Sequence, residues 1–141
     1  MKRNKDFHKY ISIFFTLLFL LLHFFIFVRT NNCKVLNTGF AFGIGGDINL
    51  KYSLRISMSL ITLIVLGILL FKEYIYRDVL IGILILSTGN FMDRIFGGIC
   101  DYISLPKILF FHIPVFNLLD LGIVLGTCVI FIDIIRNIWK K

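Results

Sequence analysis

The sequence has 141 residues, of which 58% are hydrophobic and 16% are charged, and its formal net charge is +7. A chain of this length forms a single domain, 1–141. Soluble domains carry about 25% charged residues, and the mean hydropathy of this chain is +0.92. These values exclude an ordinary soluble domain, which could not bury so much apolar surface.

Four apolar segments are predicted to cross a membrane as helices. They lie near 9–29, 53–72, 77–96 and 115–136. A spanning helix needs roughly 17–25 residues, and each segment reaches this length once the polar residues at its ends are included. We therefore expect an all-α membrane protein with four transmembrane helices.

The first segment follows the charged sequence MKRNKDFHKY and so resembles a signal peptide. However, its apolar run, ISIFFTLLFLLLHFFIFV at 11–28, is longer than the usual signal-peptide core. The sequence VRTNNC that overlaps its end offers no cleavage site of the small-x-small type. We therefore favour an uncleaved first helix over a cleaved signal peptide.

Basic residues gather at the ends of these segments rather than on one helical face. Most lie in the first nine residues, in the connection KEYIYR at 72–77 and at the C-terminus. The positive-inside rule then places both termini in the cytoplasm. Topology and anionic lipid headgroups account for the positive charge, so we expect contacts with membrane lipids and none with nucleic acid.

Two connections are expected on the outer side. In 30–52, phenylalanines alternate with small residues before a Gly-Gly-Asp turn, which predicts a small extracytoplasmic β-element. In 97–114, the apolar stretch 105–112 predicts a short interfacial helix, and Pro114 suits the first turn of the fourth helix.

The three cysteines are an odd number without CxxC spacing, which indicates neither a disulfide framework nor a zinc site. Cys33 and Cys100 would share the outer side, so one disulfide between them is permitted. Cys128 lies within the last apolar segment and is interpreted as a packing residue.

Polar side chains converge at the outer ends of the third and fourth helices. They are Asn90, Asp93, Arg94, Asp101, Asn117 and Asp120. The first three stand at i, i+3 and i+4 and the last two at i and i+3, so each set shares one helical face. Polar residues within a spanning helix are costly and indicate function, although Asp93 and Arg94 could also form a structural ion pair.

Two carboxylates held close together cannot both ionise easily, so one of them keeps its proton. Such a pair can activate a water molecule and protonate a leaving group, as in aspartic proteases. Arg94 could neutralise one carboxylate, and the asparagines could position a substrate amide or the water.

Four motifs in this region resemble those of the lipoprotein signal peptidase family, the type II signal peptidases of bacteria. They are NTGFAF at 37–42, GNFMDR at 89–94, CDY at 100–102 and PVFNLLD at 114–120. The family carries N-T-G-x-A-F, G-N-x-x-D-R, V-D-[FY] and P-x-F-N-x-A-D in the same order. The resemblance covers 37–125, and the four-helix plan extends it to the whole chain.

The resemblance implies an intramembrane aspartic endopeptidase that removes signal peptides from diacylglyceryl-modified prolipoproteins by cutting before the lipidated cysteine. It implies a catalytic pair, residues that bind and orient the substrate, and structural residues. The implied catalytic pair is Asp101 and Asp120. The residues implied to bind and orient the substrate are Asn37, Asn90, Arg94 and Asn117, and the implied structural residues are Asp93 and Gly89. It also implies no metal or cofactor, and a site at the outer face of the bacterial cytoplasmic membrane. We expect a monomer.

The chain departs from the family pattern in its first helix, where the family carries an Asp followed shortly by a Lys. Here His23 is the ionisable residue of that helix. It is either a substitute for the missing Asp or a hydrogen-bonded packing residue, and we favour packing. Leu119 replaces a small residue, and the spacing from Arg94 to Asp101 is one residue shorter than in the family.

Two other functions remain open from the sequence. The first-helix departure is compatible with a non-catalytic paralogue that binds lipoprotein precursors or cyclic peptide inhibitors. A small membrane subunit or carrier that binds ions through its carboxylates is the third hypothesis. It would need those carboxylates near the middle of the membrane, whereas here they lie toward the outer end.

Overall fold

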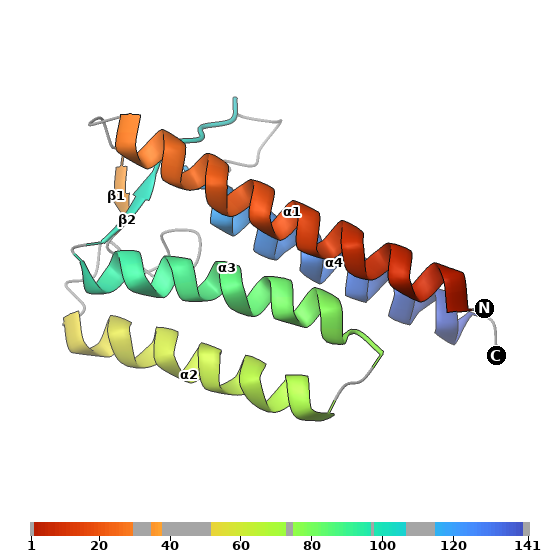
Figure 1. The fold of residues 1–141 in the computed structure, drawn as a ribbon. Coiled ribbons are helices and arrows are strands. Elements are labelled where there is room, and N and C mark those ends of the chain that lie inside the picture. Colours follow the sequence, from red (N-terminus) through yellow and green to blue (C-terminus); the bar gives the residue numbers. More distant parts are fainter. Residues whose placement is uncertain are drawn as a thin grey trace.

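The computed structural model describes residues 2–29, 35–37, 52–72, 75–96, 98–106 and 115–139. The elements are, in chain order, α1 (Lys2–Arg29), β1 (Val35–Asn37), α2 (Tyr52–Lys72), α3 (Arg77–Ile95), β2 (Ile99–Asp101) and α4 (Leu118–Ile138). The helices lie lengthwise beside one another, with the two strands at one end of the bundle and both chain termini at the other (Figure 1). We call these the strand end and the terminal end.

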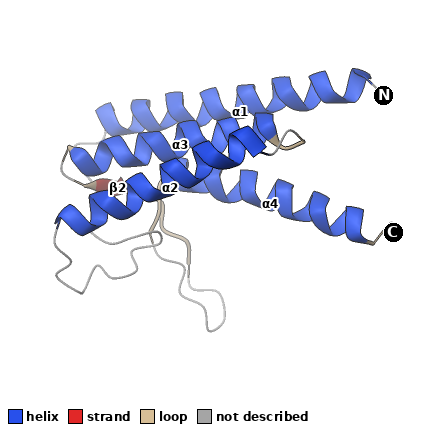
Figure 2. Ribbon diagram, turned by 90° about the horizontal axis from the view of Figure 1, so that it is seen from below, coloured by secondary structure: helices blue, strands red, loops and turns tan. Residues whose placement is uncertain are grey.

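Helix α3 is the centre of the bundle. It packs against α1, α2 and α4, and α1 also packs against α4, so that α3 lies between α1 and α2 (Figure 2). Its buried apolar side chains Leu80, Ile83 and Leu86 follow a three-residue spacing, which keeps them on neighbouring faces of the helix. Helix α3 is therefore held by all three other helices.

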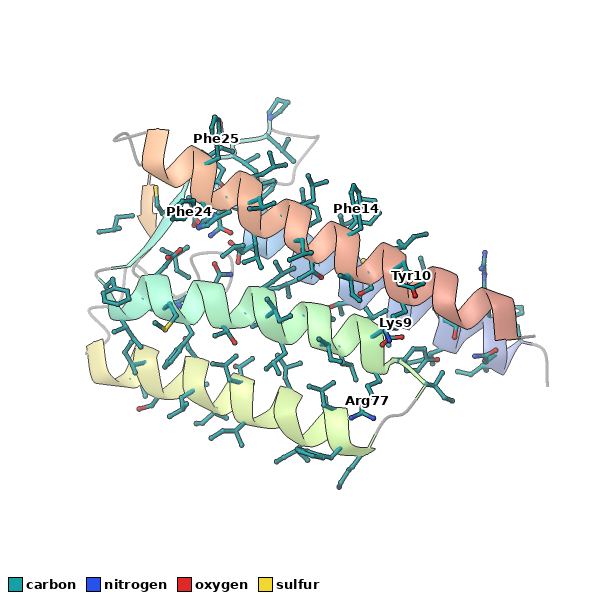
Figure 3. The ribbon with its side chains drawn as sticks, viewed as in Figure 1. Lys9, Tyr10, Phe14, Phe24, Phe25 and Arg77 are labelled. Carbon is teal, nitrogen blue, oxygen red and sulfur yellow. The ribbon has the colours of Figure 1, made fainter. Side chains whose placement is uncertain are left out.

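The outer faces of the helices are apolar. On α1, for example, the side chains of Phe14 and Phe25 are 61% and 54% exposed and point away from the other helices (Figure 3). Apolar surface of this extent requires a lipid or protein partner. In the described residues, the segments Lys9–Ile26 and Leu118–Ile138 are long and apolar enough to cross a membrane. These two segments and the exposed apolar faces indicate a membrane protein, and spans by α2 and α3 remain a prediction.

The helix bounds agree with the sequence expectations except at two starts. Helix α1 begins at Lys2 rather than near 9, because Lys, Arg and other helix-compatible residues continue the helix beyond the apolar run. Helix α4 begins at Leu118 rather than 115, because the extended backbone of Asn117 precedes it as the N-cap. The expectation that Pro114 stands in the first turn of α4 is therefore wrong.

The strands come from segments that are distant in sequence. β1 and β2 are antiparallel, with Val35 opposite Asp101 and Asn37 opposite Ile99. Gly98 precedes β2 with a φ of 126°, a conformation that disfavours other residues, and its N–H donates to the Asp93 carbonyl oxygen at 3.0 Å. This turn leads the chain from α3 directly into β2.

Two predicted elements fall mainly on residues that the structure does not describe. The alternating segment with its Gly-Gly-Asp turn lies within 38–51, outside the described residues. Of the interfacial helix expected at 105–112, the structure describes only 105–106, which are not helical.

Close helix packing generates a test at Gly122, where a Cβ atom would lie 2.5 Å from Leu86 Cδ1 and 3.2 Å from Phe19 Cδ2. We expect Gly122→Val to lower the free energy of unfolding by about 1–3 kcal/mol, the usual effect of overpacking. Gly67→Val is the matched control, because a Cβ at Gly67 meets nothing within 4 Å. Unfolding in detergent micelles measures both, and equal stabilities would contradict the packing described here.

Candidate active site

A short backbone pairing joins the end of β2 to the start of α4. Ile103 N–H donates to the Phe116 carbonyl at 2.8 Å, and Phe116 N–H donates back at 3.0 Å. The N–H of Tyr102 also donates to the Phe116 carbonyl, at 3.2 Å. Because Asp101 precedes this pairing and Asn117 follows it, their side chains are brought together at the strand end.

Asn117 caps α4 through a reciprocal capping box. Its Oδ1 accepts a hydrogen bond from the Asp120 N–H at 2.9 Å, and Asp120 Oδ2 accepts one from the Asn117 N–H at 3.5 Å. This arrangement satisfies backbone donors that the first turn of a helix leaves unpaired. It also fixes the Asp120 carboxyl group at the N-terminus of α4.

The side-chain nitrogen of Asn117 connects the two aspartates. Its Nδ2 donates to Asp101 Oδ1 at 3.1 Å and to Asn90 Oδ1 at 3.2 Å. Asn90 Nδ2 in turn donates to Asp120 Oδ1 at 2.8 Å. Asn117 is 0% exposed and Asp101 is 1% exposed, so the two bonds donated by Asn117 are buried, whereas the bond from Asn90 to Asp120 is partly buried. Side chains from α3, β2 and the start of α4 thus form one polar group.

Arg94 lies one helical turn beyond Asn90 on α3. Its side chain is buried and interacts electrostatically with the Asp120 carboxyl group. Asn37 is brought to the same end by β1, where the strand register places it opposite Ile99 and two residues from Asp101. The side chain of Asn37 lies outside the described part of the structure.

Gly89 is the point at which α3 approaches α4 closely. A Cβ atom at this position would lie 2.8 Å from Leu119 Cδ1, and Leu119 is itself buried. A side chain at position 89 would therefore force the side chain of Leu119, which directly precedes Asp120, to move. The larger Leu119 that the sequence carries in its last motif is accommodated against this glycine.

Asp93 belongs to a second polar group, on the side that faces α1. Its Oδ2 lies 3.2 Å from His23 Nε2, so His23 is an ion-pair partner of Asp93 when its imidazole is protonated. The other ring nitrogen, Nδ1, lies 3.1 Å from the Tyr102 hydroxyl. The hydroxyl oxygen of Tyr102 accepts a hydrogen bond from the Leu118 N–H at 3.3 Å.

Burial raises the pKa of the Tyr102 phenol above its ordinary value of 10.0, partly opposed by the Leu118 hydrogen bond, while nearby carboxylates raise it further. The phenol therefore keeps its proton at neutral pH. Tyr102 lies in the motif CDY but was not predicted to take part in the site. His23 could be recognised from the sequence as a candidate functional residue, because it is an ionisable residue within an apolar span.

The site contains a buried carboxyl group, Asp101, and a partly buried one, Asp120, each bonded to an amide donor, with the Arg94 side chain beside them. Such a pair can share a proton and divide acid and base roles between its members. Within the described residues, no group of three or more His, Cys, Asp or Glu could hold a metal ion. Next to Asp101, Cys100 is disulfide-bonded; Cys33 lies outside the described residues, and Cys128 is a free, exposed thiol.

The region that contains these side chains is similar to known proteins. The family model described as signal peptidase (SPase) II matches residues 30–136. A lipoprotein signal peptidase from Halalkalibacterium halodurans is 30% identical over 108 residues, which cover 72% of this chain and 65% of that relative. This chain therefore matches less than two thirds of the relative's length.

One solved structure has a similar fold. It is described as a bacterial membrane enzyme structure obtained by the in meso method, and it superposes with a TM-score of 0.70. The alignment covers 93% of this chain and 91% of the other at 20% sequence identity, so the likeness concerns the fold alone.

The hydrogen bonds of Asn117 generate a stability test. Asn117→Ala removes an N-cap, which costs about 1 kcal/mol, and removes the amide that donates to Asp101 and Asn90 in the interior, which costs roughly 1–3 kcal/mol. We expect a loss of at least about 2 kcal/mol in unfolding free energy. Asn137→Ala, at an exposed position of α4, should change it by less than about 0.5 kcal/mol; equal losses would refute the role of Asn117.

Proposed function

The chain belongs to the signal peptidase II family, and on this basis we propose that it is an intramembrane aspartic endopeptidase. Its substrates are diacylglyceryl-modified prolipoproteins, and it removes their signal peptides by cutting before the lipidated cysteine. The observation that carries the proposal is the linkage of Asp101 to Asp120 through Asn117 and Asn90. The name of the relative from Halalkalibacterium halodurans supports the substrate class.

In this proposal Asp101 and Asp120 act as one catalytic unit. The ionised carboxylate accepts a proton from a water molecule as the water oxygen attacks the scissile carbonyl carbon. The protonated carboxyl group stabilises the developing oxyanion by giving it a proton. As the tetrahedral intermediate collapses, the carboxyl group that took the water proton gives it to the leaving nitrogen, the C–N bond breaks, and the hydroxyl formed from the oxyanion returns its proton to the other carboxylate. The pair titrates as a unit, so we assign the shared proton to the pair.

The neighbouring side chains would hold this unit in place. Asn117 and Asn90 donate hydrogen bonds to the two carboxyl groups, which fixes the direction of their free lone pairs. Arg94 offsets the negative charge of the site. Asn37, carried by β1 beside β2, would orient the substrate backbone, while Asp93 and Gly89 are structural.

The proposed topology follows from the two ends of the bundle. Lys9 and Arg77 lie toward the terminal end, away from the strands (Figure 3). By the positive-inside rule this end is cytoplasmic, so the four helices span the membrane and the site lies at its outer face. We place the protein in the bacterial cytoplasmic membrane as a monomer surrounded by lipids, and assign it no nucleic-acid partner. The outer face supplies the water that hydrolysis requires.

Cleavage of a diacylglyceryl-modified prolipoprotein by the purified protein in detergent tests this function. We expect the wild type to cut before the lipidated cysteine. Asp101→Asn and Asp120→Asn, which keep the side-chain shape but cannot ionise, should each lower kcat by more than about a thousandfold, as loss of a member of a catalytic unit does. Asp133→Asn is the matched control, because Asp133 lies on α4 near its other end and accepts a hydrogen bond from Tyr76.

Two results would count against the proposal. A folded wild type that binds the precursor without cutting it would identify a non-catalytic paralogue instead. Equal activity of the wild type and both site variants would show that the carboxyl pair is not the catalytic unit.

A further inference from the structure

His23 is a buried polar side chain in the apolar helix α1, and both of its ring nitrogens have partners. Nδ1 lies 3.1 Å from the Tyr102 hydroxyl, and Nε2 lies 3.2 Å from Asp93 Oδ2. An imidazole buried in such surroundings is costly unless its nitrogens are hydrogen-bonded. Here the two bonds reach residues 70 and 79 positions further along the chain.

The partners of Tyr102 decide which nitrogen of His23 carries the proton. The phenol oxygen already accepts from the Leu118 N–H at 3.3 Å, and the phenol has a single proton to give. If that proton goes to His23 Nδ1, this nitrogen is the unprotonated acceptor of a neutral imidazole. The proton of a neutral imidazole consequently lies on Nε2 and is donated to Asp93. In this arrangement every donor in the chain from Leu118 to Asp93 has an acceptor.

The residues that His23 holds stand at both ends of the segment that carries Asp101. At one end, the Asp93 carbonyl accepts from the Gly98 N–H and so shapes the turn into β2. At the other end, Tyr102 directly follows Asp101, and its hydroxyl binds Leu118, the first residue of α4. One imidazole on α1 therefore secures both the approach to β2 and the contact between its end and α4.

We propose that His23 is a positioning residue, a neutral Nε2–H imidazole that fixes the segment carrying Asp101 against the start of α4 and so sets the geometry of the aspartate pair. This rests on the proposed function of that pair. His23 itself touches neither aspartate in this role; it acts through Asp93 and Tyr102. Helix α1 thereby takes part in the site without contributing a catalytic group.

Nitrogen-15 NMR of the full chain, labelled at histidine and held in detergent micelles, tests the tautomer. The His23 signals are those that disappear in His23→Gln. We expect one protonated and one unprotonated nitrogen, with the proton on Nε2, and a shift of the Nδ1 signal in Tyr102→Phe. Tyr76→Phe removes a hydroxyl bonded to Asp133 and should leave these signals unchanged. Signals averaged between tautomers, or unmoved by Tyr102→Phe, would overturn the proposal.

Cleavage kinetics test the positioning role. His23→Leu removes both hydrogen bonds and should lower kcat by about tenfold to a hundredfold, the effect of a small misplacement of reacting groups, with KM nearly unchanged. His23→Gln can still donate to Asp93 and accept from Tyr102, so it should recover most of kcat. Thr16→Val removes another buried polar group of α1, one bonded within its own helix, and serves as the control.

The outcomes separate this inference from the proposed function. A wild-type kcat in His23→Leu, or a loss in His23→Gln as large as that in His23→Leu, would overturn the positioning role while cleavage by the wild type still stands. A wild type that cuts nothing would overturn the proposed function. The NMR measurement would then decide alone whether His23 holds Asp93 and Tyr102.

Discussion

The strand end of this protein depends on the buried side chain of Asn117. An amide without partners is costly in the interior, and here its oxygen and nitrogen are both used, by Asp120 on one side and by Asp101 and Asn90 on the other. The same amide therefore caps the start of α4, binds Asp101 at the end of β2 and binds Asn90 on α3. None of these elements can shift without breaking a hydrogen bond inside the protein, which gives the site its rigidity.

A second constraint acts on the opposite side of the same segment. Successive side chains of an extended chain point in opposite directions. Asp101 accordingly faces Asn117, while Tyr102 reaches His23 on α1. The segment is held from two sides by polar groups in apolar surroundings, where hydrogen bonds are stronger and their loss is more costly. Two short hydrogen-bond networks thus hold this segment in place within a bundle whose outer faces are apolar.

The sequence predicted the four helices because apolar runs of this length are strong local signals, and α2 and α3 match the expected bounds within a residue. It also predicted that Asn90, Asp101, Asn117 and Asp120 would converge, from the four-span topology and helix periodicity. It could not predict the pairing of β1 with β2, since strands of three residues carry no periodic pattern and their partners are distant. The start of α4 was missed because a capping side chain, rather than hydropathy, sets it. His23 was expected to be hydrogen-bonded, but its partners could not be predicted because they depend on tertiary distance, which no local pattern contains.

The turn before β2 has a consequence for how the chain can vary in length. Removing a residue within β2 would rotate Asp101 to the other side of the strand, because side chains alternate along it. Removing one ahead of the strand, at the turn that Gly98 closes with its φ of 126°, leaves the facing of Asp101 unchanged. The shorter spacing from Arg94 to Asp101 that the motif resemblance predicts would thus be tolerable only where the change in length falls before Ile99. Insertions and deletions during the divergence of this protein would be confined to that turn, while the strand itself keeps its length.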